Sequence, residues 1–201
     1  MATALQCSHT TSQKGRVIYM NIFWLDKDPL LAVQYHCDKH IVKMPLELTQ
    51  MLCTAHHLHN SVFTIPYKPV HQKHPCTLWI AECATHYKIA WKFGQRLFKE
   101  YTYRYRRVHA SQTVLEHLYY PPSRIPEGKY RFPPQAMPDQ YKHHDYVYAY
   151  QQYYIGEKAR FCKWTNRTIP PFMEEKMESL LCSVTRKHYE GVISKMNKEV
   201  A

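Results

Sequence analysis

The segment from Tyr35 to Lys43, YHCDKHIVK, combines several side chains that can move protons or bind anions. His36 and His40 are four positions apart, so on one helix their imidazoles share a face, and Lys43 follows within about 60°. Two imidazoles at this spacing suit an acid–base pair or two metal ligands, and a neighbouring lysine can act as a nucleophile or bind phosphate. No spacing rule selects further metal ligands, so no metal is predicted. The competing interpretation is that both histidines are hydrogen-bonded core side chains.

Two loop motifs contain further candidate groups. His74 comes directly before Pro75, at the expected start of a helix, where an anion or a catalytic imidazole is stabilised. Asp139 lies in the sequence QAMPDQYK and is a candidate general base, while Gln135 opens that sequence and could read the edge of a nucleobase. Each motif is also consistent with a rigid turn that binds no ligand.

The run from Lys88 to His109 is basic and aromatic, since seven lysines and arginines accompany a single acid, Glu100. Such a surface can track a phosphate backbone and stack on bases, although a solvated helix face with snorkelling lysines has the same composition. Arg104 falls at the apolar edge of the predicted helix, so we expect it to point into a pocket.

The candidate residues are spread over several segments of the chain. The catalytic candidates are His36, His40, Lys43, His74 and Asp139. The candidates for phosphate or base contacts are Lys39, Lys88, Lys92, Arg96, Arg104, Arg107, Gln135, Lys158 and Arg160, and the stacking candidates are Tyr101, Tyr103 and Tyr154.

The composition favours a polyanion as the partner. The 201 residues contain 27 lysines and arginines against 16 acids, a net charge of +11, although a merely solvated basic surface would have the same charge. No run of about 18 apolar residues is present, so no membrane partner is expected. The seven cysteines are odd in number and form no C-x-x-C motif, which indicates a reduced intracellular setting.

Several enzyme classes lose support because their motifs are absent. The sequence contains no GxGxxG, GxxxxGK[ST], GxSxG or HExxH motif, and it lacks the paired signature of the zinc deaminases. These absences weigh against kinases, Rossmann oxidoreductases, hydrolases and deaminases, and no cofactor is predicted.

Helices and one long loop must position these groups. Hydrophobic periodicity predicts a mainly α-helical single domain, with at most a short strand or a buried arm near 18–25. Asp28, Thr77 and Asp145 are candidate N-caps, and Pro45 should kink or split the first helix. The predicted helices span 29–59, 77–106, 111–120, 145–161 and 172–196, with an ordered proline-rich loop at 121–144. The predicted organisation is a flexible extension at 1–19, a helical core domain at 20–173 and a C-terminal helix or tail at 174–201.

Five sequence blocks together resemble a family of short proteins encoded by tailed bacteriophages and large DNA viruses. The blocks are YHCDKHIVKMPLE (35–47), HPCTLW (74–79), EYTYRY (100–105), QAMPDQYK (135–142) and YYIGEKARFCKW (153–164), and the resemblance covers about 20–173. It implies a role in DNA metabolism, of base-excision or base-modifying type. The matching residues that would inherit such a role are His36, Asp38, Lys39, His40, Lys43, His74, Arg104, Gln135, Asp139, Lys158 and Arg160.

The hypothesis from the sequence is therefore a viral enzyme that acts on DNA or a nucleotide. His36 or His40 would transfer protons with Asp139 or Asp38 as the carboxylate partner, and Lys43 would be the amine nucleophile in lyase-type chemistry. DNA is the favoured partner, and the oligomeric state is left open. The alternatives are a nucleic-acid-binding protein without catalysis and a viral structural or host-interaction protein.

Overall fold

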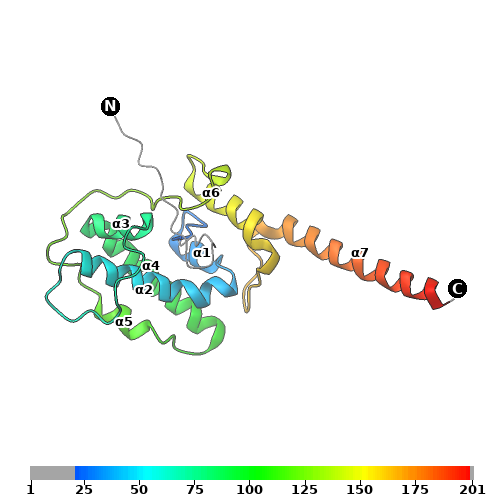
Figure 1. The fold of residues 1–201 in the computed structure, drawn as a ribbon, viewed down its shortest axis with the longest axis horizontal. Coiled ribbons are helices and arrows are strands. Elements are labelled where there is room, and N and C mark those ends of the chain that lie inside the picture. Colours follow the sequence, from blue (N-terminus) through cyan, green and yellow to red (C-terminus); the bar gives the residue numbers. More distant parts are fainter. Residues whose placement is uncertain (1–20, 200–201) are drawn as a thin grey trace.

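The computed structural model describes residues 21–199, with the backbone alone for 186, 188–189 and 191–199. Helices dominate this part of the chain, which contains no strand (Figure 1). The α-helices are α1 (Pro29–Gln34), α2 (Asp38–Leu58), α3 (Pro75–Glu82), α4 (Ala84–Tyr105), α5 (Gln112–His117), α6 (Tyr146–Tyr153) and α7 (Glu174–Glu199). Short turns of 3₁₀ or π geometry are η1 (Asp139–Tyr141), η2 (Tyr154–Lys158), η3 (Ala159–Phe161) and η4 (Pro171–Met173).

The core forms where α2 packs against α3 and α4. Ile41 and Leu48 of α2 are buried, as are Phe93 and Leu97 of α4. Burying each such side chain contributes about 1.5–3 kcal/mol, and this apolar pairing fixes α2 in the centre of the domain. The mainly α-helical single domain predicted from periodicity is confirmed.

The predicted helix 29–59 is interrupted between α1 and α2. Tyr35 caps α1, and Cys37 has an extended backbone and precedes α2 as its N-cap. Asp38 then donates its amide proton to the carbonyl of Lys163 at 2.8 Å, which explains why the chain turns here. His36 therefore lies before α2, and the prediction that one helix face carries His36 and His40 is wrong. Pro45 does not split α2, which continues through it in a fully buried setting.

The predicted helix 77–106 is also two helices. His74, rather than Thr77, is the N-cap of α3, and its Nδ1 accepts the amide proton of Cys76 at 3.2 Å. At Cys83 the backbone is extended, with φ −157° and ψ 159°, and Ala84 donates to the carbonyl of Pro126 at 2.8 Å. The 121–144 loop thus accepts a hydrogen bond from a backbone amide that would donate within the helix if the helix were continuous.

The segment at the described N-terminal end is a buried arm, not a strand. Ile22, Phe23 and Leu25 are buried, and Asn21 Nδ2 donates to the carbonyl of Ala136 at 2.8 Å. The strand prediction is therefore wrong for 21–25, while 18–20 and the extension predicted for 1–19 fall outside the described residues. Side-chain packing holds the arm where a strand would need a neighbouring strand to pair with.

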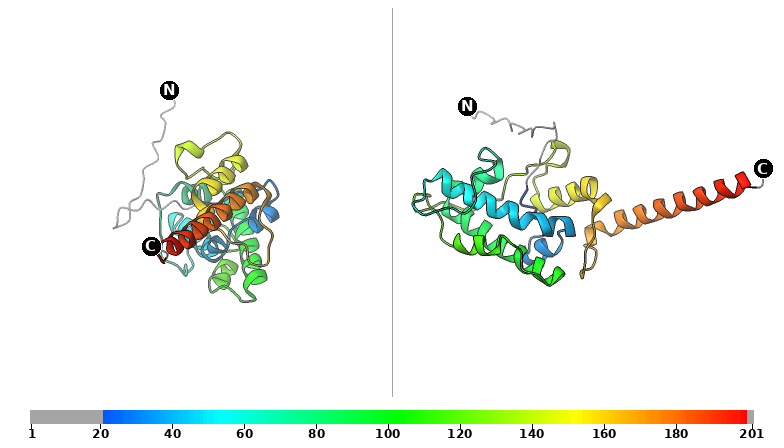
Figure 2. Two further views of the ribbon diagram at one scale, coloured as in Figure 1. Left: turned by 90° about the vertical axis from the view of Figure 1, so that its right-hand side faces the viewer. Right: turned by 60° about the horizontal axis from the view of Figure 1, so that its bottom comes forward.

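The remaining elements follow the predicted order with changed ends. Asp145 caps α6 as predicted, but α6 ends at Tyr153 and continues as the π turn η2 and the 3₁₀ turn η3. The 121–144 segment is a loop in which only η1 is regular. Helix α7 begins at Glu174 and projects away from the other helices (Figures 1 and 2).

Candidate functional site

A buried imidazole and a buried phenol meet at the first turn of α2. His40 Nδ1 is hydrogen-bonded to the hydroxyl of Tyr154 in η2, and Phe23 of the arm stacks on the imidazole with ring centroids 4.6 Å apart. Burial raises the pKa of Tyr154 well above its usual value, so its hydroxyl stays protonated.

Two thiols from distant parts of the sequence lie beside this pair. Cys37 and Cys162 are 125 positions apart, and both are buried. A hydrogen bond from Cys162, with a further contribution from His40, lowers the pKa of Cys37, while the same bond and burial raise the pKa of Cys162. No motif spacing in the sequence marks this pair, because it depends on how η3 packs against the start of α2.

His36 is held as a neutral side chain. It is fully buried, its Nδ1 is 2.8 Å from the carbonyl of Ala32, and its ring centroid is 6.4 Å from that of His40. Burial, with the nearby His40 and Arg104, lowers its pKa to about 3. Its Nε2 has no hydrogen-bond partner within the described part of the chain. At neutral pH His36 is therefore uncharged, and its one ring proton is donated to the carbonyl of Ala32.

Two of the predicted cations belong to α2 and η2, the elements that meet at His40. Lys39 Nζ lies 5.0 Å above the ring of Phe161, which itself meets the imidazole edge-on with centroids 5.9 Å apart. Lys158 is partly buried, and its Nζ is 3.1 Å from the hydroxyl of Tyr153.

Two further cations lie within electrostatic range of Lys158. Burial, reinforced by Arg160 and Lys43 and opposed by Glu157, lowers the pKa of Lys158. The amine of Lys43 is instead exposed and paired with Glu47 at 2.6 Å. Of the two lysines, Lys158 is therefore the better candidate for an uncharged amine.

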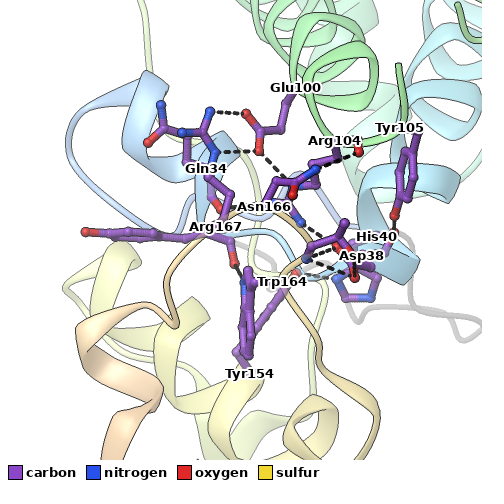
Figure 3. Close-up of polar contacts among 12 residues, drawn as sticks. Gln34, Asp38, His40, Glu100, Arg104, Tyr105, Tyr154, Trp164, Asn166 and Arg167 are labelled. Carbon is purple, nitrogen blue, oxygen red and sulfur yellow. Dashed lines mark hydrogen bonds and ion pairs between the residues drawn. The ribbon is translucent and has the colours of Figure 1, made fainter. Parts of the chain in front are cut away.

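Arg104 does not point into a ligand pocket. Its guanidinium is buried and donates to Asp38 Oδ1 at 2.9 Å, to Glu100 Oε1 at 2.7 Å and to the carbonyl of Gln34 at 2.8 Å (Figure 3). Arg167 pairs with the same Glu100 at 2.8 Å. The predicted phosphate contact of Arg104 is thus replaced by a buried ion-pair network that joins α1, α2 and α4.

Asp38 belongs to that network rather than to a histidine. Its carboxylate accepts from Arg104 and from the backbone and hydroxyl of Thr165, at 2.8–3.1 Å. The two histidines have other partners, Tyr154 for His40 and the carbonyl of Ala32 for His36.

The remaining catalytic and base-reading candidates belong to the loop framework. Asp139 is exposed on η1 and pairs with Lys142 at 2.7 Å. The amide group of Gln135 bonds at both ends to the backbone of His143, at 2.6 and 3.0 Å. His74 caps α3, and burial lowers its pKa to about 4. None of these contacts joins the His40 site.

The three predicted stacking tyrosines do not form one platform. Tyr154 is buried against His40, and Tyr101 packs edge-on against His109 with centroids 4.8 Å apart. Tyr103 is partly exposed, but the guanidinium of Arg167 covers its ring at 4.0 Å. The packing of α4 against its neighbours separates side chains that alternate in the sequence.

The basic face of α4 borders a hollow. Lys88, Lys92 and Lys99 are exposed on this helix, Arg96 is partly exposed, and Arg107 follows just beyond its end. Lys92 and Arg96, together with Lys27, line a hollow of about 370 Å³ whose other walls are largely aromatic. Lys92 and Arg96 were predicted from the sequence, whereas the aromatic residues of the hollow, which come from the arm, from α4 and from the 121–144 loop, were not.

Among residues 21–199, no group of three His, Cys, Asp or Glu side chains is placed to hold a metal ion. No helix in that range is long and apolar enough to cross a membrane. No protein-family model matches the chain, and no curated protein or solved structure matches it either.

Proposed function

We propose that the protein is a viral enzyme that acts on DNA or a nucleotide, of base-excision or base-modifying type, with its reaction centre at His40. The observation that carries the proposal is the imidazole of His40, which is fixed by the Tyr154 hydroxyl and meets the ring of Phe161 edge-on, with the cation of Lys39 over that ring. The partly buried amine of Lys158 belongs to the same turn η2 as Tyr154. An anionic substrate that needs proton transfer fits this combination.

Each side chain has a separate role in the proposed reaction. His40 exchanges a proton with the substrate through Nε2, and Tyr154 holds the ring in its orientation. Lys39 and Arg160 attract phosphate. In lyase-type chemistry the amine of Lys158 attacks the C1′ aldehyde carbon of an abasic sugar and forms a Schiff base with loss of water, because a partly buried lysine with a lowered pKa is the more nucleophilic amine.

The resemblance to proteins of tailed phages and large DNA viruses supports DNA as the substrate. The net charge of +11 supports the same polyanion. The second candidate is a nucleic-acid-binding protein without catalysis, which the exposed lysines 88, 92 and 99 on α4 favour.

The first experiment measures base release and nucleoside mass after incubation of the full chain with single-stranded and duplex DNA. We expect His40→Asn to slow the reaction by at least about 100-fold, whereas His117→Asn, on exposed α5, leaves it unchanged. DNA binding by the His40 variant should be unaltered. Absence of any product, with charge reversal at Lys88 and Lys99 abolishing binding, would favour the binding protein instead.

A second experiment tests the amine. Borohydride reduction during incubation with DNA that contains an abasic site should trap a covalent protein–DNA complex. Lys158→Met should remove this complex, and the matched control Lys43→Met should retain it, because Lys43 is paired with Glu47. Trapping that depends on Lys43 instead would contradict the role given to Lys158.

A further inference from the structure

The hollow beside α4 has a floor and a rim of aromatic rings. Trp24 and Phe93 are buried, with ring centroids 5.0 Å apart and an interplanar angle of 18°. Tyr130 and Phe132 line the same hollow and are 42% and 38% exposed. Tyr130 and Phe132 thus present exposed rings to one planar ligand above a floor of Trp24 and Phe93, and the volume of about 370 Å³ is within the usual range for small-molecule sites.

The cations at this hollow form no ion pair with a carboxylate of the described residues. Lys27, Lys92 and Arg96 all line it, and no acidic residue does. Within residues 21–199, none of these three cations has a carboxylate within 4.0 Å, whereas Lys88 on the same helix faces Glu127 at 3.9 Å. An aromatic hollow with unpaired cations at its edge is complementary to a ring that carries phosphate.

The hollow is distinct from the His40 site. The arm contributes Phe23 to the His40 site, where it stacks on the imidazole, and the next residue, Trp24, to the hollow. These consecutive side chains have different ring partners, His40 for Phe23 and Phe93 for Trp24, so the arm runs between the two places. Phe93 also lies between them, since its ring is 6.0 Å from that of His36 and 5.0 Å from that of Trp24.

We infer that this hollow binds one unstacked nucleotide, with the base on the exposed ring of Phe132, above the floor that Trp24 forms, and its phosphate on Lys92 and Arg96. The inference goes beyond the proposed reaction at His40, because binding here requires no chemistry. The shared ligand chemistry is a nucleobase with an attached phosphate. Its source is a free mononucleotide or an unpaired nucleotide of a strand, and the test separates the two.

The test measures binding of three kinds of probe to the full chain. They are the mononucleotides dTMP and dAMP, a labelled (dT)₁₂ strand, and a blunt duplex. Two variants test the two parts of the inferred contact, which are the ring that stacks on the base and the cation that binds the phosphate. Phe132→Ala should weaken binding of the strand by about ten-fold, as expected for loss of one stacked base. Arg96→Gln should weaken it as well and lower the slope of log affinity against log salt by about one.

Matched controls separate this site from general electrostatic attraction. Phe63→Ala removes a partly exposed phenylalanine that does not line the hollow, and Lys176→Gln removes an exposed charge on α7. Both controls should bind like the wild type, and thermal unfolding should show that all four variants are folded. Mononucleotide binding that responds to the same two variants would identify the free nucleotide as the source, and strand binding alone would identify the unpaired strand.

Three results would overturn the inference. One is a loss of strand binding in Arg96→Gln without any loss in Phe132→Ala, which would mean that only charge matters. Another is equal weakening by Lys176→Gln. The third is absence of binding by every probe at low salt. Product assays are not involved, so failure of the reaction proposed at His40 would leave these results unchanged.

Discussion

His40 and Tyr154, 114 positions apart in the chain, are joined by a hydrogen bond between the imidazole Nδ1 and the phenolic hydroxyl (Figure 3). Tyr154 opens the π-helical turn η2, so the chain places this hydroxyl by leaving regular helix geometry. Turns of this kind inside helices are frequent at functional sites. The bond fixes the orientation of the one histidine that we assign to proton transfer.

Removal of the Tyr154 hydroxyl should reduce both stability and turnover. Tyr154→Phe retains the buried ring but leaves His40 Nδ1 without its partner, so we expect a loss of about 1–2 kcal/mol in the free energy of unfolding. Urea titration measures this loss, and Tyr148→Phe, at an exposed tyrosine of α6, is the matched control. Equal stability of the two variants would show that the hydrogen bond contributes nothing.

Arg104 should prove structural rather than ligand-binding. Arg104→Gln leaves Asp38 and Glu100 without their shared guanidinium in a buried setting, so the free energy of unfolding should fall by about 3–5 kcal/mol. Arg107→Gln, at an exposed position, should change it by no more than about 0.5 kcal/mol. The denaturant midpoints of both variants decide the question. A stable Arg104 variant with weakened DNA binding would restore the role first predicted for this residue.

Stability should fall as the pH falls below about 6.5, the usual pKa of histidine. Burial lowers the pKa of His36 to about 3 and those of His56 and His74 to about 4. Between pH 6.5 and 4 the unfolded chain therefore binds protons that the folded chain does not bind. The free energy of unfolding rises with pH across this window. Urea midpoints measured from pH 7.5 to 4.5 follow this dependence.

The share of His74 can be isolated by one substitution. His74→Asn keeps a side-chain oxygen at the N-cap of α3 and removes the titrating group. We expect this variant to lose part of the pH dependence with little change in stability at pH 7.5. An unaltered slope between pH 6.5 and 4.5 would mean that His74 does not contribute.

Gly156 should not tolerate a larger side chain. A Cβ atom at this position would lie 2.8 Å from Cε1 and Cζ of Tyr141 and closer still to its hydroxyl oxygen. Gly156→Ala must therefore displace the Tyr141 ring and its bond to Glu157, at an expected cost of about 1–3 kcal/mol. In a Tyr141→Leu background the same substitution should cost clearly less, and a double-mutant cycle measures the difference.

Local sequence signals predicted most of the helical content. Apolar periodicity marked the central stripe of α2 and α4, and Asp145 was a correct N-cap because its carboxylate accepts the amide protons of Val147 and Tyr148. The two predicted helices that are interrupted are those in which a backbone amide donates to another segment of the chain. Asp38 bonds to Lys163 and Ala84 to Pro126, and at both places a predicted continuous helix is interrupted.

For the candidate site, the sequence identified side chains but not their partners. His40, Lys39 and Lys158 were singled out by residue type, and they lie on α2 and η2, the two elements that the bond between His40 and Tyr154 joins. Arg104, Gln135 and Asp139 were singled out on the same grounds, yet they bond to Asp38, His143 and Lys142. Residue type cannot distinguish these cases, because a charged group takes whichever partner the packed elements place nearest.

By itself, the sequence determined the helical class, the excess positive charge and the supply of aromatic rings, since these depend on composition and on contacts between near neighbours. Only the tertiary structure decided that Tyr154 meets His40, that Cys37 meets Cys162 and that Trp24 shares a hollow with Arg96. Such meetings are set by how α2, α4, the arm and the 121–144 loop pack together. Packing depends on contacts between residues that are distant in the chain, which no local pattern records.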